Sequence, residues 1–230
     1  TVFADYELIL TDVVGQTTVL DVRSEEAVQQ AVAAYRPQVI LHLAAATDVD
    51  RCEQDPQWAH QLNAMGTAHV ARACRKYAAL LVYLSTGAVF SGDKATPYVE
   101  DDVPQPANAY GRSKLDGERS ISALLERYAI VRAGWMIGGG AKDKKFVGKI
   151  VRLLAGGRQS LQVVNDTWGS PTYAKDVLIG VRRLLEADRY GLYHMVNPGC
   201  CSRYEIALAV LDLLHRPDVE IVPVSSEAFP

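Results

Sequence analysis

Short apolar runs alternate with helical stretches along most of this chain of 230 residues. Such runs are typical of buried strands, and the stretches between them have the features of amphipathic helices. The predicted strands are Glu7–Leu10, Val39–Leu43, Leu80–Leu84 and Ile130–Arg132, and the predicted helices begin at Ser24, at Asp55 and near Tyr110. Regular alternation of this kind builds βαβ units, whose strands form a parallel sheet. The sequence therefore predicts an α/β fold with a doubly wound parallel sheet.

Capping residues mark three of the predicted helix starts. Ser24 precedes two glutamates, and Asp55 precedes a proline in the first helical position. Ser202 is followed three residues later by Glu205, which is the capping-box pattern. These local signals predict where the helices begin.

The glycines and lysines of residues 138–145 interrupt the alternation and predict a loop into a second lobe. We predict a main domain of residues 1–135 and 171–196, and a small substrate-binding lobe of residues 136–170 and 197–230. The lysines of this loop could attract a diphosphate, but a run of charges is more often a solvated surface, and we adopt that interpretation. They are Lys142, Lys144 and Lys145.

Composition restricts the ligands. A net charge of -3 with mixed signs gives no basic surface for nucleic acid, and no apolar run reaches the roughly 18 residues that a membrane span needs. Two of the four cysteines are adjacent and none has metal-ligand spacing, which favours a reducing cytoplasm. His42, His69 and His194 lie in apolar or helical surroundings, so we expect structural roles and no metal. Small molecules are the expected ligands.

Tyr110 and Lys114 place a phenol and an ammonium group one helical turn apart. Because such a pair shares one helix face, the lysine can lower the pKa of the tyrosine and tune it for proton transfer. Ser85 and Thr86 follow the apolar run 80–84, and ligands bind beyond the carboxyl ends of parallel strands. The pattern predicts an acid/base site there. The alternative is an ordinary surface helix beside a strand that ends in threonine.

Further motifs follow this pair in a characteristic order. They are Val-Phe-x-Gly at residues 89–92, Pro-Tyr-x-Glu at 97–100, Tyr-Gly-x-Ser-Lys-x-x-Gly-Glu at 110–118 and Gly-Ser-Pro-Thr-Tyr at 169–173. With them, most of the sequence resembles the extended short-chain dehydrogenase/reductases. The resemblance implies a Rossmann-like domain with a small substrate lobe.

The resemblance also implies a reaction, the NAD(P)H-dependent reduction of a nucleotide-linked 4-keto (deoxy)sugar. Tyr110 would donate a proton to the nascent alkoxide, and Lys114 would tune Tyr110 and bind the nicotinamide ribose. Thr86 would hydrogen-bond to the substrate oxygen. Two hydroxyl groups at that oxygen would stabilise the negative charge that grows as hydride arrives.

Residues near other strand ends would hold the cofactor. Asp12 could accept hydrogen bonds from the adenosine ribose and would repel a 2′-phosphate, which favours NAD over NADP, although aspartate is also a common turn residue. Asn63 matches a helix asparagine of the family, and a surface amide would match equally well. The implied cofactor contacts are Asp12, Asp21, Val22, Ala44, Ala45, Ala46, Ser85, Tyr110 and Lys114.

Substrate contacts are implied at Thr86, Val89 and Trp135. Trp135 lies where related sugar reductases carry a tryptophan, and an indole offers a sugar an apolar face and one N–H donor. Packing within the small lobe is the alternative for this residue. In one place the sequence departs from the family, because Gly87 and Ala88 replace an aspartate and a tyrosine. This change predicts a wider pocket with fewer polar contacts.

A dinucleotide-binding sheet normally begins with a strand, a Gly-x-x-Gly-x-x-Gly loop and a helix that together hold the pyrophosphate. This sequence has no such segment, and residues 1–12 resemble the end of that helix and the strand after it. We expect about 25 to 30 residues, one βα unit, to precede them in the protein, and a further segment to follow residues 221–230. A true deletion, which would expose a sheet edge, is the alternative.

Two other functions remain open. Nucleotide-sugar epimerases and dehydratases share the fold, but dehydratases usually carry a carboxylate beside the threonine, where this chain has Gly87. A non-catalytic regulatory binding module would not need Thr86, Tyr110 and Lys114, so the presence of all three favours an enzyme. The sequence does not fix the oligomeric state, and a homodimer is retained as one option.

Overall fold

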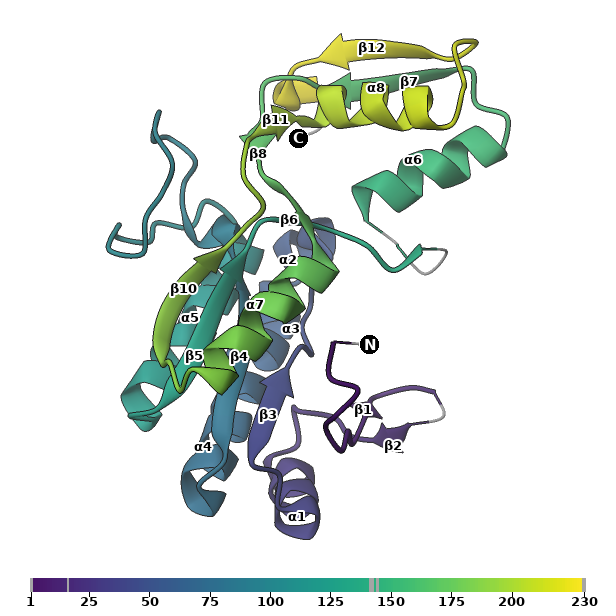
Figure 1. Cartoon of the computed structure of the whole chain (residues 1–230). Coiled ribbons are helices and arrows are strands. Elements are labelled where there is room, and N and C mark those ends of the chain that lie inside the picture. Colours follow the sequence, from purple (N-terminus) through teal and green to yellow (C-terminus); the bar gives the residue numbers. More distant parts are fainter. Residues whose placement is uncertain (1, 16, 141–142, 144, 229–230) are drawn as a thin grey trace. The chain divides into compact units, whose positions relative to one another are not determined.

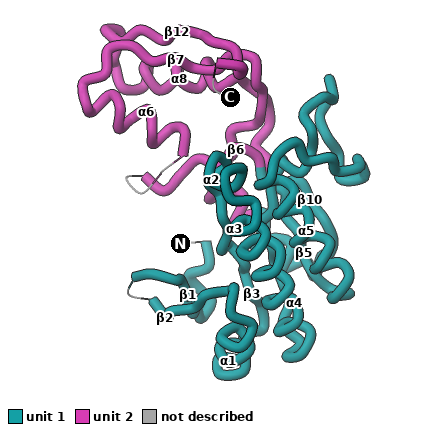
Figure 2. The backbone as a smooth tube through the Cα atoms, turned by 180° about the vertical axis from the view of Figure 1, so that it is seen from behind, with its two compact units in different colours: residues 1–133, 180–195 teal, residues 134–179, 196–230 magenta. Residues whose placement is uncertain are grey.

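The computed structural model describes residues 2–15, 17–140, 143 and 145–228. The chain divides into two compact units, which are residues 1–133 with 180–195 (unit 1) and residues 134–179 with 196–230 (unit 2) (Figure 2). The division differs from the predicted one mainly at residues 171–179. These residues fall in unit 2 because β9 (Pro171–Tyr173) pairs with β6 (Trp135–Ile137) of that unit.

A parallel sheet of four strands, in the order β10-β5-β4-β3, forms the centre of unit 1. Its strands are β3 (Val39–His42), β4 (Leu80–Thr86), β5 (Tyr128–Ala133) and β10 (Gly191–Met195). The two central strands are largely buried and read as near-continuous apolar runs, as expected for a parallel sheet covered on both faces. The predicted α/β class and the strands predicted around residues 39–43, 80–84 and 130–132 are confirmed.

Helices cover this sheet on both faces (Figure 1). Three of them, α1 (Glu25–Tyr35), α4 (Gly66–Tyr77) and α5 (Ala109–Leu124), contribute Val28, Val70 and Ile121 to a core shared with the strands. Residues 180–186 of α7 (Ala174–Glu186) lie on the other face. The predicted caps are confirmed, because the side chains of Ser24 and Asp55 accept hydrogen bonds from Ala27 N and Trp58 N.

The first predicted strand is wrong. Residues 7–10 have no strand structure, and β1 covers only Thr11–Asp12, where it pairs with β2 (Thr18–Val19) in a separate two-stranded sheet. A strand needs a neighbour for its N–H and C=O groups. Of residues 7–12, only Thr11 and Asp12 pair in a ladder, and Leu10 adds one bond through its carbonyl oxygen to Thr18 N at 3.2 Å. Apolar side chains of this segment are exposed, among them Leu8, Leu10 and Val14.

The described residues of unit 2 form three two-stranded sheets, the helices α6 (Phe146–Ala155) and α8 (Arg203–Leu213), the first part of α7 and a short 3-10 helix, η4 (Ser226–Ala228). The pairs are β6–β9, β12–β7 and β11–β8, formed by β7 (Ser160–Val164), β8 (Trp168–Gly169), β11 (Cys201–Ser202) and β12 (Glu220–Val224). Helices α6 and α8 pack on a core that includes Ile150, Leu161 and Ile221. The predicted capping box of Ser202 and Glu205 is confirmed. Lys142 and Lys144 lie outside the described residues.

In the described part of the chain, no helix has both the length and the apolar character that crossing a membrane requires.

Candidate active site

Thr86 is the last residue of β4, one of the two central strands of the sheet. A short 3-10 helix, η2 (Gly87–Val89), turns the chain away directly after it. The Thr86 hydroxyl accepts a hydrogen bond from Ala88 N at 3.1 Å, which fixes the side chain at the carboxyl end of the strand. This is the edge at which parallel α/β sheets bind their ligands.

Tyr110 lies in the first turn of α5, and capping fixes that turn. Asn108 caps the helix by accepting from Gly111 N at 2.8 Å, and Ala109 N donates to the carboxylate of Glu53 at 2.7 Å. Burial raises the pKa of Tyr110, and the nearby side-chain hydroxyl of Thr86 opposes this rise. The two hydroxyl groups predicted to act together are therefore neighbours.

Lys114 follows one turn later on the same helix and is only 2% exposed. Its Nζ donates to the carbonyl oxygen of Leu84 at 2.8 Å and lies 3.9 Å from the ring centroid of Tyr83. Burial lowers the pKa of Lys114 to about 7, an effect that the negative charge of Glu118 opposes. The ammonium group is thus held below the end of β4, on the face of α5 that carries Tyr110.

Two glycines allow α5 to approach the strands this closely. A Cβ atom on Gly111 would lie 2.1 Å from the carbonyl oxygen of Ala88, and one on Gly117 would lie 2.7 Å from the carbonyl oxygen of Asn63. Real Cβ atoms do not come so near to other heavy atoms. The glycines of the Tyr-Gly-x-Ser-Lys-x-x-Gly motif therefore set the distance between α5 and the end of β4.

Asn63 joins the same helix to the end of β3. It lies, fully buried, in a π-helical segment, η1 (Gln61–Met65), and π-helical turns are frequent at functional sites. Its amide oxygen accepts from Ala46 N at 2.7 Å, and its amide nitrogen donates to Ala46 O at 3.0 Å and to Ser113 Oγ at 2.9 Å. The surface alternative for this asparagine is wrong.

Some of the predicted cofactor residues follow a strand of the central sheet, and others lie outside that sheet. Ala44 to Ala46 follow the carboxyl end of β3, where Ala44 is exposed, Ala45 half-buried and Ala46 buried. Asp12 lies outside the central sheet, on β1, where its carboxylate accepts from Val13 N at 2.6 Å.

Asp21 and Val22 lie between β2 and α1. The Asp21 carboxylate is bound by the backbone N–H and guanidinium of Arg23, and this bonding lowers the pKa of Asp21. Val22 has a core side chain, and its carbonyl oxygen bonds to His69 Nδ1 at 2.9 Å.

Two predicted substrate residues are placed differently from what we expected. Val89 is 0% exposed and packs with Phe90 and Leu115, so its side chain belongs to the core and leaves only the main chain for contact with a ligand. Trp135 lies in unit 2, half-buried, with the guanidinium of Arg203 4.0 Å from its ring centroid. This stacking on Arg203 corresponds to the lobe-packing alternative.

One buried ion pair was missed in the sequence. Glu118 binds Arg132 of β5 through two hydrogen bonds, Nε–Oε1 at 3.0 Å and Nη2–Oε2 at 2.7 Å, and Ser85 donates to the same carboxylate at 2.5 Å. The available signals were an arginine inside an apolar strand and a glutamate one turn after Lys114. Ser85, predicted at the cofactor, has its hydroxyl engaged in this network.

The histidines bond within unit 1. His42 Nε2 is 3.1 Å from Thr67 Oγ1, and His194 Nδ1 is 3.2 Å from the carbonyl oxygen of Tyr98. Glu100 of the Pro-Tyr-x-Glu motif accepts from the backbone N–H of His194, so this motif attaches its loop to β10.

Among the described residues, no group of three or more potential ligands could hold a metal ion. No disulfide joins the four cysteines.

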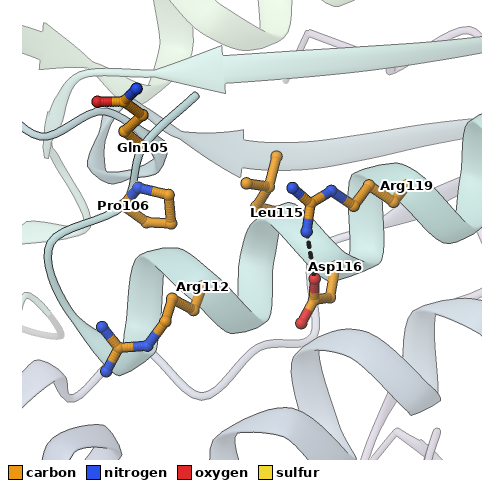
Figure 3. Close-up of a pocket in the computed structure, with 6 residues that line it drawn as sticks. All are labelled: Gln105, Pro106, Arg112, Leu115, Asp116 and Arg119. Carbon is orange, nitrogen blue, oxygen red and sulfur yellow. Dashed lines mark hydrogen bonds and ion pairs between the residues drawn. The ribbon is translucent and has the colours of Figure 1, made fainter. Parts of the chain in front are cut away.

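A hollow lies on the outer side of α5 (Figure 3). It is lined by Gln105, Pro106, Arg112, Leu115, Asp116 and Arg119. On a helix these α5 positions face away from those of Tyr110 and Lys114, because side chains repeat every 3.6 residues. The hollow is therefore separate from the candidate active site.

Comparison with known proteins agrees with the motifs. The family model "RmlD substrate binding domain" matches residues 8–230. A dTDP-4-dehydrorhamnose reductase of Mycobacterium tuberculosis is 39% identical over 197 residues, which are 84% of this chain and 64% of that protein. The chain therefore spans less than two thirds of the length of this relative.

Two solved structures are similar in fold and sequence. The dTDP-4-dehydrorhamnose reductase of Yersinia enterocolitica is 40% identical, with a TM-score of 0.88 over 99% of this chain and 78% of that one. The enzyme of that name from Bacillus anthracis, solved in complex with NADP, is 39% identical, with a TM-score of 0.87 over 91% of this chain and 74% of that one. Since the family model covers nearly the whole sequence, the chain belongs to the RmlD substrate binding domain family.

Proposed function

We propose that this protein is an NAD(P)H-dependent reductase of a nucleotide-linked 4-keto sugar, with the activity of a dTDP-4-dehydrorhamnose reductase. One observation carries the proposal. Thr86 ends a central parallel strand, the phenol of Tyr110 lies close enough to its hydroxyl for the two to interact, and the buried ammonium of Lys114 bonds to Leu84 O of the same strand. The names of the relatives that are similar over most of the chain support the same activity.

The three side chains suit the reduction of a carbonyl group. When bound, the reduced nicotinamide supplies the hydride that reaches the keto carbon. Tyr110 donates its phenolic proton to the carbonyl oxygen as charge develops there, and Thr86 donates a second hydrogen bond to that oxygen. Because burial raises the pKa of Tyr110, the phenol stays protonated at neutral pH and can act as the acid. Lys114 stabilises the phenolate that remains after the transfer.

The residues at this edge fit the nicotinamide end of the cofactor. Ala44 and Ala45 are small, accessible side chains beyond β3, so a flat ring system can approach the main chain closely. The ammonium of Lys114 has N–H groups beyond the one bonded to Leu84 O, and a ribose hydroxyl can accept from them. Asp12 favours NAD, whereas the similar Bacillus anthracis protein was solved with NADP, so we propose NAD(P) without a preference.

For the substrate, Gly87 and Ala88 leave space beside Thr86, and the main chain of Val89 is close in sequence to it. Trp135 stays a proposed contact for the sugar ring, made through the part of its half-buried indole that the packing on Arg203 leaves accessible. We further propose a cytoplasmic role in dTDP-rhamnose biosynthesis. We also propose that the protein forms a homodimer, and sedimentation equilibrium would measure its mass in solution.

The proposal is tested by mixing full-length protein with NADPH or NADH and dTDP-4-dehydrorhamnose. We expect the absorbance of the reduced nicotinamide to fall in proportion to the sugar added, and the product to carry a hydroxyl group at C4. A protein that binds the cofactor but consumes none with any 4-keto nucleotide sugar would refute the proposal. Conversion of a nucleotide sugar without net oxidation of the cofactor would identify an epimerase or a dehydratase instead.

A further inference from the structure

A buried cluster of charges lies on α5 and β5, about two helical turns from the proposed proton donor and entirely within unit 1. Glu118 follows Lys114 by one turn of α5, and its carboxylate accepts hydrogen bonds from Arg132 and Ser85. The side chains of Arg132 and Glu118 are 4% and 5% exposed. A charged pair of this kind loses its hydration almost completely when the protein folds.

Such a pair is an inefficient way to stabilise a fold. Removing two charges from water costs several kcal/mol per ion, and apolar residues of similar volume often replace a buried pair without loss of stability. Here one guanidinium nitrogen, Arg132 Nη1, is buried without a hydrogen-bond partner in the described structure. A function for the pair other than stability therefore has to be considered.

The groups around Lys114 point to that function. His42 on β3 is neutral, since burial lowers its pKa to about 3, and Tyr83 on β4 faces Lys114 with its ring. On α5 itself the neighbours are Tyr110, a neutral phenol, and Glu118. Arg132 on β5 reaches this region through Glu118. Of the groups named, only Glu118 brings negative charge to balance the buried ammonium.

We propose that Glu118 is a positioning residue: its carboxylate, held by Arg132 and Ser85, is the counter-charge that keeps the buried Lys114 ammonium protonated beside Tyr110. Without it, burial would favour the neutral amine, because a low-dielectric environment disfavours charge. Arg132 holds the carboxylate through two hydrogen bonds, while Lys114 Nζ, one turn earlier on the same helix face, bonds to Leu84 O. The opposing effects of burial and of Glu118 on the pKa of Lys114 agree with this arrangement.

The catalytic consequence rests on the proposed function, but the charge of Lys114 can be measured without turnover. Full-length protein with ¹³C in its lysine side chains is titrated by NMR, and Lys114→Met identifies the signal. We expect Glu118→Gln to lower the titration midpoint of Lys114 by about one pH unit or more, since an opposite charge nearby raises a lysine pKa by roughly that amount. The matched control is Asp116→Asn, on the outer side of the same helix (Figure 3), which should leave the midpoint unchanged.

Arg132→Gln removes the cation of the pair instead, and should move the midpoint in the opposite direction. If a single variant does not fold, the double variant Glu118→Gln/Arg132→Gln removes both members of the ion pair together and should still have a lower midpoint than the wild type. A midpoint in Glu118→Gln that matches the Asp116→Asn control, or shifts of the same sign in both single variants, would overturn the proposal. So would an unchanged midpoint in the double variant.

In an active enzyme, the alkaline limb of the pH profile of kcat/KM should move to lower pH in Glu118→Gln, because Lys114 loses its proton earlier as pH rises. A purely structural role would lower activity at every pH without moving the limb. If the wild type proves inactive as a reductase, the proposed function fails, while the NMR titration still decides the role of Glu118.

Discussion

Gly111→Ala should destabilise the protein although alanine is the better helix former. Gly111 lies in the first turns of α5, and a Cβ atom there would be 2.1 Å from the backbone oxygen of Ala88 and 2.9 Å from Cβ of Pro106. The first contact cannot be relieved by rotating a side chain, because the overlapping atom belongs to the backbone of η2. Either α5 or η2 has to move.

The size of the effect follows from two opposing contributions. Replacing glycine by alanine in a helix gains about 0.8 to 1 kcal/mol of intrinsic propensity. Overpacking of a buried contact costs about 1 to 3 kcal/mol, and the upper end applies when backbone must shift. We therefore expect a net loss of about 2 kcal/mol, which in a protein of this size corresponds to a melting temperature lower by about 4 to 8 °C.

The measurement is thermal or chemical unfolding of Gly111→Ala beside a matched variant, Gly87→Ala. A Cβ on Gly87 would meet only Ala133 O, at 3.8 Å, which is ordinary van der Waals contact, so its unfolding free energy should change by less than about 0.5 kcal/mol. If Gly111→Ala is as stable as Gly87→Ala, the close approach of α5 to η2 does not exist as described, and the geometry of Tyr110 and Thr86 loses its support.

Three further substitutions test other parts of the site. Thr86→Val keeps the branched shape but removes the hydroxyl group, and should lower kcat by about 10²-fold with little change in melting temperature, as steady-state kinetics would reveal. Asn63→Ala breaks three buried hydrogen bonds, and denaturant titration should show a loss of about 2 to 4 kcal/mol; a loss below about 1 kcal/mol would contradict the bonding described. Glu118→Ala leaves Arg132 charged and unpaired in the interior and should cost about 3 to 5 kcal/mol by the same assay, whereas wild-type stability would show that water reaches the guanidinium.

Features that depend on neighbouring residues in the chain could be predicted from the sequence. The short apolar run 80–84 predicts a buried strand of a parallel sheet, which is what it forms. The caps at Ser24, Asp55 and Ser202 depend only on the residues that follow them. The shared helix face of Tyr110 and Lys114 follows from their spacing alone.

Features that depend on distant partners could not be predicted. The residues expected to form a strand at 7–10 are not paired in a strand ladder, and no local pattern marks this. The burial of Asn63 rests on bonds of its side chain to Ala46 and Ser113, which come from other parts of the chain. A valine such as Val89 can line a pocket or lie in the core. Only its packing against Phe90 in the structure shows that its side chain lies in the core.

Donation of the proton by Tyr110 is tested most directly by the rate of NAD(P)H oxidation in Tyr110→Phe at a saturating concentration of a dTDP-linked 4-keto sugar. Phenylalanine keeps the ring that packs against the core and removes only the hydroxyl group. We predict a rate lower by about 10²- to 10⁴-fold, with cofactor binding and melting temperature close to those of the wild type. A rate within a few-fold of the wild type, in a variant that folds and binds the cofactor, would contradict the assignment of Tyr110 as the acid.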